Sequence, residues 1–337
     1  MATLWQFGGQ RLASLADLQS VFGAGADYFD PDPLDDGGLG VGINSTGASL
    51  PVNLSGDTYA FHFGAQYIGS PLNVEGGVVG VDVAGSFGDR VPNLRERQGR
   101  FRLRVGSTVI HSRPADELLT GAHWVLEVRE HATAGYVRLF RNGTLLYEDT
   151  DRDTTPNTAG PRFLRLGGGS TDTGSRRVRY SHLVLATENL GELVRVRQLV
   201  PSTDEGPNDF TRSDTGRDHY EHINESPHLG DGRFLESEDF GDSTRHGMSL
   251  GLTGVEVLSV QPIAIARIDG SGANDLEVEI ESGASASGNL PLGTVVGSSY
   301  GMIQGPILNQ NPATSAPWTL SALEALRMRF EHVDGST

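Results

Sequence analysis

The amino-acid sequence predicts an all-β fold made of two β-sandwich domains. Several short segments alternate between apolar and polar residues, which is the period of a strand with one buried face. Asn142 and Gly143 separate two such segments, and Asn-Gly in this position is the strongest short-range signal for a β-hairpin. Glycine accounts for 45 of the 337 residues, which favours turns and strands over long helices. A chain of this length predicts two domains.

The first segment, residues 1–50, is predicted to be a leader that is irregular apart from one short helix. Leu15, Leu18 and Phe22 fit one helical face, and Gly23 would end that helix. We therefore expect this segment to lie outside the first sandwich.

Trp5 and Phe7 are the candidate docking residues of this leader. A large apolar side chain near a terminus can anchor a partner subunit. Packing of both residues onto the chain's own domain is the alternative, and the sequence leaves the two open.

Asp30, Asp32, Asp35 and Asp36 are the candidate metal ligands. Carboxylate oxygens are the ligands that Ca²⁺ prefers, so Ca²⁺ is the ion that would suit them. The spacing does not meet the EF-hand pattern, and an acidic turn is the alternative. No other cofactor is expected.

A second group of possible metal ligands lies further along the chain, at His219, His222 and His228. The His-x-x-His spacing could bind zinc from a loop. A solvated polar loop is the competing interpretation, and it is the favoured one because the zinc-protease motif H-E-x-x-H is absent.

Residues 51–190 are predicted to form the first sandwich. Residues 59–63 and 101–105 alternate, and residues 124–130 repeat the pattern with Trp124 among the inward-facing side chains. The alternating segments on either side of Asn142-Gly143 complete the hairpin.

A run of segments within this domain resembles a concanavalin/laminin-G jelly roll. The segments are His123–Val128, Gly135–Gly143, Leu164–Gly167 and Tyr180–Leu185. The resemblance implies two antiparallel sheets packed face to face, with ligand contacts made by loops. We expect those loops at residues 85–98, 149–160 and 168–176.

Residues 191–337 are predicted to form the second sandwich. Strands are expected at residues 255–268, 276–280 and 328–333, with residues 204–247 polar and irregular between the first strand and the others. A short helix is expected near residues 322–326, and Trp318 just before it is interpreted as a core anchor.

The order of segments in this second domain resembles bacteriophage particle proteins attached to tails or baseplates. The segments that carry it are Leu199–Ser202, His219–Pro227, Asp239–Asp242, Val255–Gln261 and Asn309–Val333, the last with Pro-x-Thr and Trp-Thr. Ile223-Asn224-Glu225 stands where the family usually has Val-Asp-Glu, a change of one charge.

This resemblance implies a structural virion protein, in a tail fibre or a baseplate-attached appendage. A capsid decoration or head-fibre protein is the alternative. The implied partners are other virion subunits and a host-surface glycan. A homo-oligomer is expected, with a trimer favoured because fibres are commonly trimers. The expected location is the phage tail, after assembly in the host cytoplasm.

Charge and composition exclude several other classes of partner. The net charge of −17 disfavours nucleic acid and anionic membranes. The chain has no cysteine, which excludes disulfides and a thiol nucleophile. No apolar run reaches the ~18–20 residues that a membrane span needs, so membrane insertion is not expected.

The sequence also argues against catalysis. No G-x-S-x-G, phosphate-binding or dinucleotide-binding motif stands in a strand–turn–helix context. Glu127 and Glu130 lie on opposite faces of their strand, so they could not line one groove. We therefore expect a protein that is not an enzyme, with a host-polysaccharide depolymerase as the remaining alternative.

Overall fold

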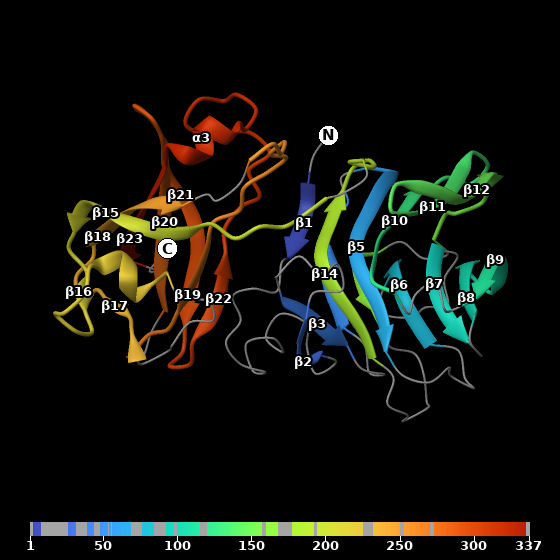
Figure 1. Cartoon of the computed structure of the whole chain (residues 1–337), viewed down its shortest axis with the longest axis horizontal. Helices are drawn as coiled ribbons and strands as arrows, with labels where there is room; N and C mark the ends of the chain where they lie inside the picture. The colour runs from blue at the N-terminus through green and yellow to red at the C-terminus, as the bar shows by residue number, and fades with distance from the viewer. Residues whose placement is uncertain are drawn as a thin grey trace. The chain divides into compact units, whose positions relative to one another are not determined.

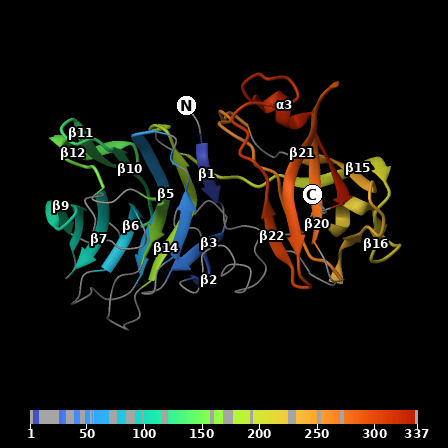
Figure 2. The same cartoon turned by 180° about the vertical axis from the view of Figure 1, so that it is seen from behind.

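The computed structural model of the chain divides into two compact units, which we call unit 1 and unit 2, with the boundary between Arg197 and Gln198 (Figure 1, with the reverse view in Figure 2). Both units are built almost entirely from antiparallel strands, which confirms the all-β class. The structure describes residues 3–7, 26–31, 39–43, 48–52, 54, 56–68, 76–83, 92–97, 100–114, 120–156, 160–167, 177–191, 194–224, 232–249, 253–269 and 273–334.

Unit 1 contains two antiparallel sheets. The eight-stranded sheet has the order β12 (Thr144–Arg152), β11 (Gly135–Arg141), β10 (Ala122–Arg129), β5 (Thr58–Ile68), β14 (Arg177–Ala186), β3 (Leu39–Ile43) and β2 (Ala26–Pro31), with β1 (Thr3–Phe7) also paired to β14. The six-stranded sheet has the order β4 (Ala48–Val52), β13 (Arg162–Leu166), β6 (Gly76–Val83), β7 (Pro92–Arg97), β8 (Arg100–Val105) and β9 (Thr108–Pro114).

The two sheets of unit 1 pack face to face around an aromatic core. The indole of Trp124 on β10 meets the ring of Phe101 on β8 edge to face, with 5.4 Å between centroids, and both side chains are fully buried. The buried phenol of Tyr180 on β14 donates to the carbonyl of Val78 on the other sheet. These contacts confirm Trp124 as a core residue and confirm the sandwich.

The hairpin expected at Asn142 and Gly143 is present between β11 and β12. Both residues have positive φ, 47° and 76°, which a tight two-residue turn of this kind requires. The Asn142 side chain adds a contact, because its Oδ1 accepts the backbone N–H of His123 at 3.0 Å.

The N-terminal 50 residues do not form the separate leader that the sequence predicted. Residues 1–50 contain β1, β2 and β3, which belong to the eight-stranded sheet, and most of β4, which belongs to the six-stranded one. The prediction of a separate leader was therefore wrong. The backbone hydrogen bonds of β1 and β3 are made with β14, and those of β4 are made with β13. The helix expected near residues 15–22 lies outside the described residues.

Unit 2 is built on one five-stranded sheet. Its order is β15 (Val200–Asn208), β18 (Ser243–Ser249), β23 (Leu326–Asp334), β20 (Ala273–Ser282) and β21 (Ser285–Val296). Two short ribbons join β16 (Thr211–Arg212) to β17 (Leu235–Glu236) and β19 (Ile263–Ala266) to β22 (Gly301–Gln304). Neither helix in the described parts of unit 2, η3 (His219–His222) or α3 (Leu320–Glu324), could cross a membrane.

The core of unit 2 lies on one face of this sheet, where Val278, Ile280 and Met328 pack with Trp318 and Leu323. The indole N–H of Trp318 donates to the carbonyl of Leu308 at 2.8 Å, so the residue is anchored by a hydrogen bond as well as by burial. The expected core role of Trp318 is confirmed.

The short C-terminal helix is also confirmed, although α3 begins two residues earlier than expected, at Leu320. Thr319 caps it, since its hydroxyl oxygen accepts the backbone N–H of Ala322 at 3.1 Å. The polar stretch 204–247 was expected to be irregular, but it contains most of β15 and β18.

Candidate functional site

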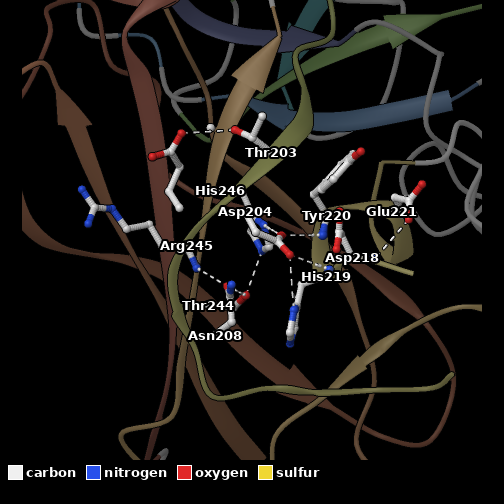
Figure 3. A network of polar contacts seen from close by, with 12 residues as sticks. Thr203, Asp204, Asn208, Asp218, His219, Tyr220, Glu221, Thr244, Arg245 and His246 are labelled. Carbon is white, nitrogen blue, oxygen red and sulfur yellow. Dashed lines mark hydrogen bonds and ion pairs between the residues drawn. The ribbon is translucent and has the colours of Figure 1, made fainter. Parts of the chain in front are cut away.

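A polar network in unit 2 centres on Asp204 of β15 (Figure 3). Asp204 pairs in register with His246 of β18, so sheet formation alone places these two side chains next to each other. The distance from Asp204 Oδ1 to His246 Nδ1 is 3.2 Å.

Asp204 also holds the start of η3. Its two carboxylate oxygens accept the backbone N–H groups of His219 and Tyr220, each at 2.8 Å. These are the first N–H groups of the helical turn, which have no partner within it. One carboxylate thus fixes a turn that lies 15 residues further along the chain.

The two histidines beside Asp204 reach different partners. His219 Nε2 lies 3.0 Å from the carbonyl oxygen of Phe210, and because a carbonyl only accepts, Nε2 carries the hydrogen. His246 Nε2 lies 2.9 Å from the hydroxyl of Thr244, which in turn contacts Asn208 Oδ1 at 3.1 Å.

Burial and hydrogen bonding decide the charges in this network. Burial lowers the pKa of His246 to about 4, although the nearby carboxylate of Asp204 opposes that shift. Burial alone would raise the pKa of Asp204, but the N–H donors of His219 and Tyr220 outweigh it and lower that pKa. At neutral pH the network therefore holds an ionised Asp204 beside a neutral His246.

The order of Asp204, His246 and Thr244 is that of an acid, a base and a hydroxyl, the arrangement that activates nucleophiles in hydrolases. Here the side chain of His246 is fully buried and Thr244 is 2% exposed, so no substrate atom can reach the hydroxyl. The network fixes the polar segment that contains η3 and does not form an open reactive centre.

The possible zinc ligands do not converge. His219 turns to Asp204, while His222 contacts the hydroxyl of Ser213 at 3.1 Å through Nδ1. His228 lies outside the described residues. In the part of the chain that the structure describes, no group of three or more His, Asp or Glu side chains could hold a metal ion.

The calcium and docking candidates lie in unit 1. Asp30 is on β2, opposite Gly40, and Asp32, Asp35 and Asp36 lie outside the described residues. Trp5 and Phe7 are on β1, where their backbones pair with Leu185 and Leu183 of β14.

The loops expected to contact a ligand are only partly described. Of residues 85–98, the described part is β7, and residues 149–152 are the end of β12. Residues 168–176 lie outside the described residues.

At one edge of unit 1 the two sheets meet through the edge strands β9 and β12. The imidazole of His111 stacks on the ring of Tyr147, with 4.5 Å between centroids. Val109 and Leu145 on these strands are 43% and 46% exposed. The phenol of Tyr147 donates to Asp149 at 3.3 Å. We call this surface the edge patch: Val109, His111, Leu145, Tyr147, Asp149 and Arg152, the last paired with Asp149.

Comparison with known proteins gives similarity at the level of fold. No protein-family model matches the sequence, and no curated protein sequence matches it. An endo-β-1,4-glucuronan lyase from the fungus Trichoderma reesei is 14% identical, with a TM-score of 0.36 over 54% of this chain and 94% of the lyase.

Two other solved structures match about half of this chain. Trypanosoma rangeli sialidase is 17% identical with a TM-score of 0.37, over 50% of this chain and 27% of the sialidase. The binding domain of botulinum neurotoxin serotype G is 10% identical with a TM-score of 0.36, over 50% of this chain and 43% of that domain.

The lyase and the sialidase correct one expectation. The sequence predicted a protein that is not an enzyme. This exclusion of catalysis was wrong, because the similar structures include enzymes. The absence of sequence motifs could not support it, since catalytic residues are brought together by the fold and need no shared local motif. The similarity transfers no catalytic residue to this chain.

Sequence reasoning missed the centre of the network. The chain from residue 204 onward was expected to be irregular, whereas β15 continues through Asp204 to Asn208. No local signal marks this contact, because Asp204 lies 15 residues before the turn that it holds.

Proposed function

We propose that the chain is a structural protein of a bacteriophage particle, in a tail fibre or baseplate-attached appendage. Unit 2 assembles with other virion subunits, and unit 1 presents a surface to a host glycan. The location in the tail, the homotrimer and the glycan are parts of the same proposal.

The observation that carries this proposal is the role of the residues on which the phage resemblance rests. His219 and Tyr220 are held by Asp204, while Trp318 and Thr319 fix the approach to the last strand. All four residues make contacts that determine the fold of unit 2. Because these residues serve to fix the fold, they support the role of unit 2 as a rigid module for assembly.

The edge patch of unit 1 supports the binding half of the proposal. Sugars are bound by an aromatic face together with a few directional polar groups, and Tyr147 with Asp149 and Arg152 offers this combination. The patch also lies on β9 and β12, which end their sheets in the part of the chain that the structure describes, and Val109 and Leu145 there are half-exposed.

The assembly half is tested on purified particles. Mass spectrometry and immunogold labelling should find the chain in the virion, on the tail, and sedimentation of the purified protein should give a trimer. Its absence from particles would refute the proposal, and labelling on the head would favour the decoration protein.

The binding half is tested with capsular polysaccharide and lipopolysaccharide from the host. Tyr147→Ala should lose binding measured by calorimetry, while Phe240→Ala, which removes an aromatic side chain 58% exposed on unit 2, should bind as the wild type does. Equal binding by both variants would remove the edge patch from the proposal. Shortening of the polysaccharide during incubation would identify the chain as a depolymerase.

A further inference from the structure

A ladder of arginines lies on the outward face of two neighbouring strands of unit 1, β7 and β8 (Figure 1). Side chains alternate between the two faces of a strand, and on β8 Phe101 and Leu103 are fully buried between the sheets. The positions on either side of them therefore face outward. We call the outward-facing cations of the two strands the arginine ladder: Arg95, Arg97, Arg100, Arg102 and Arg104.

The register of the two strands brings these like charges together. Arg95 lies directly opposite Arg102, and Arg97 lies directly opposite Arg100. Side chains in such positions have Cβ atoms about 5 Å apart, and like charges placed there are destabilising. The acidic residue on these strands, Glu96, gives no relief on this face, because its side chain is fully buried on the core side. This concentration of positive charge stands in a chain whose net charge is −17.

The chain does not neutralise the exposed end of the arginine ladder. The side chains of Arg97 and Arg102 form no hydrogen bond or ion pair within the part of the chain that the structure describes. Arg100 donates to a neutral partner, since its Nε lies 2.9 Å from Ser112 Oγ and its Nη2 lies 3.2 Å from the carbonyl oxygen of Ser112. These contacts fix the direction of the Arg100 guanidinium and leave its charge available to an anion from outside.

Unit 2 also has a charged sheet face, but its charges are neutralised within the chain. On the face of the five-stranded sheet that lies away from the core, Arg245 pairs with Glu281, and Arg329 pairs with Glu279 at 3.0 Å. The row of glutamates on β20 therefore already has cationic partners. This argues against the same row of a second copy as the partner of the arginine ladder.

The spacing of the arginine ladder suits a linear polymer with repeated negative charges. Residues on the same face of a strand are about 7 Å apart, so the arginine pairs form successive rungs that such a polymer can follow. A guanidinium can donate two parallel N–H groups to one carboxylate, which makes arginine well matched to this anion.

The surroundings of the ladder favour a polysaccharide over other polyanions. Single-stranded nucleic acid is bound by stacking on aromatic side chains as well as by charge, and protein partners are bound through large anchoring side chains that fill pockets. The outward positions of β7 and β8 hold no aromatic and no apolar side chain. A sugar polymer needs only directional polar donors, which the guanidinium groups supply.

We propose that the arginine ladder binds a linear polysaccharide that carries carboxylates. The proposal gives a chemical class to the host glycan of the proposed function, and in that respect it rests on the proposed function. The net charge of −17 repels such a polymer at long range, but at physiological ionic strength charges more than about 8 Å apart are largely screened. Close contacts with the arginines then decide the binding.

The like-charge pairs separate a binding role from a structural one. The ladder variant, Arg97→Gln with Arg102→Gln, removes one charge from each pair, so its unfolding temperature should be equal to that of the wild type or higher. The same variant should bind the polymer at least about tenfold more weakly, because each lost contact joined two charged groups. A structural role would lower the unfolding temperature instead.

The test is calorimetric titration of the full chain with polygalacturonate in about 0.15 M salt, with dextran as the neutral reference polymer. The wild type should bind polygalacturonate and not dextran. The matched control carries Arg129→Gln and Arg217→Gln, which change the net charge equally at side chains that are each 41% exposed and paired with an aspartate. This control should bind as the wild type does.

Three results would overturn the proposal. The first is no binding of polygalacturonate by the wild type, and the second is equal binding by the ladder variant and the control. The third is equally tight binding of polyglutamate or oligothymidylate through the same arginines, which would identify a general anion surface.

Failure of the ladder and failure of the proposed function give different results. If Tyr147→Ala loses the host polysaccharide while the ladder variant keeps it, the edge patch alone binds the glycan and the ladder proposal falls. If the ladder binds polygalacturonate but the chain is absent from phage particles, the ladder proposal stands and the virion role falls.

Discussion

At the residue scale, the chain depends on single side chains that join distant segments. Asp204 accepts two backbone N–H groups of η3 and contacts His246 of a neighbouring strand. A hydrogen bond to a charged acceptor contributes more than one between neutral groups. Asp204 thus determines whether the polar segment of unit 2 has one conformation.

Asp204→Asn should destabilise unit 2 by about 1–3 kcal/mol, because an amide leaves one part-buried N–H of η3 facing another donor. Urea unfolding followed by circular dichroism measures this change. Asp239→Asn, at an exposed residue, is the matched control and should stay within about 0.5 kcal/mol of the wild type. Similar losses in the two variants would show that Asp204 has no special role.

At the element scale, local turn chemistry fixes the register of a whole hairpin. Gly143 has a φ of 76°, and β11 pairs with β12 from Arg141 and Thr144 onward. Because side chains alternate between faces, a shift of one residue in this turn would move Val137 and Leu139 out of the core.

Gly143→Ala should therefore cost about 1–2 kcal/mol, since a Cβ strains the left-handed backbone. Gly56→Ala is the matched control, because open space surrounds that position and its φ is outside the left-handed region. Thermal unfolding of both variants distinguishes them. A neutral Gly143→Ala would mean that another contact, such as that of Asn142 with His123, sets the turn.

At the scale of the whole molecule, the two units have separate cores. Leu126 is buried in unit 1, and Val278, Ile280 and Trp318 form part of the core of unit 2. Chains with separate cores unfold domain by domain, so a single unfolding free energy does not describe them.

Calorimetry should accordingly resolve two unfolding transitions. Leu126→Ala should lower the temperature of one transition only, through a loss of about 2–5 kcal/mol. Asp204→Asn should lower the other. A single transition that both substitutions shift would contradict two independently stable units.

The sequence by itself determined the features that depend on near neighbours along the chain. Alternation predicted the strands around Trp124, Asn142-Gly143 predicted the hairpin, and the segment after Trp318 predicted a short helix. Each follows from a period or a turn preference within a few residues.

Only the tertiary structure decided the strands of the expected leader, the Asp204 network and the contact between Leu190 and His62. β1 obtains its partner from β14, and Leu190 finds its acceptor 128 residues earlier, at His62. A local pattern says which face of a strand is buried, but not which distant strand or side chain will lie beside it. That choice depends on how the whole chain packs, because each buried polar group must find its partner in the folded molecule.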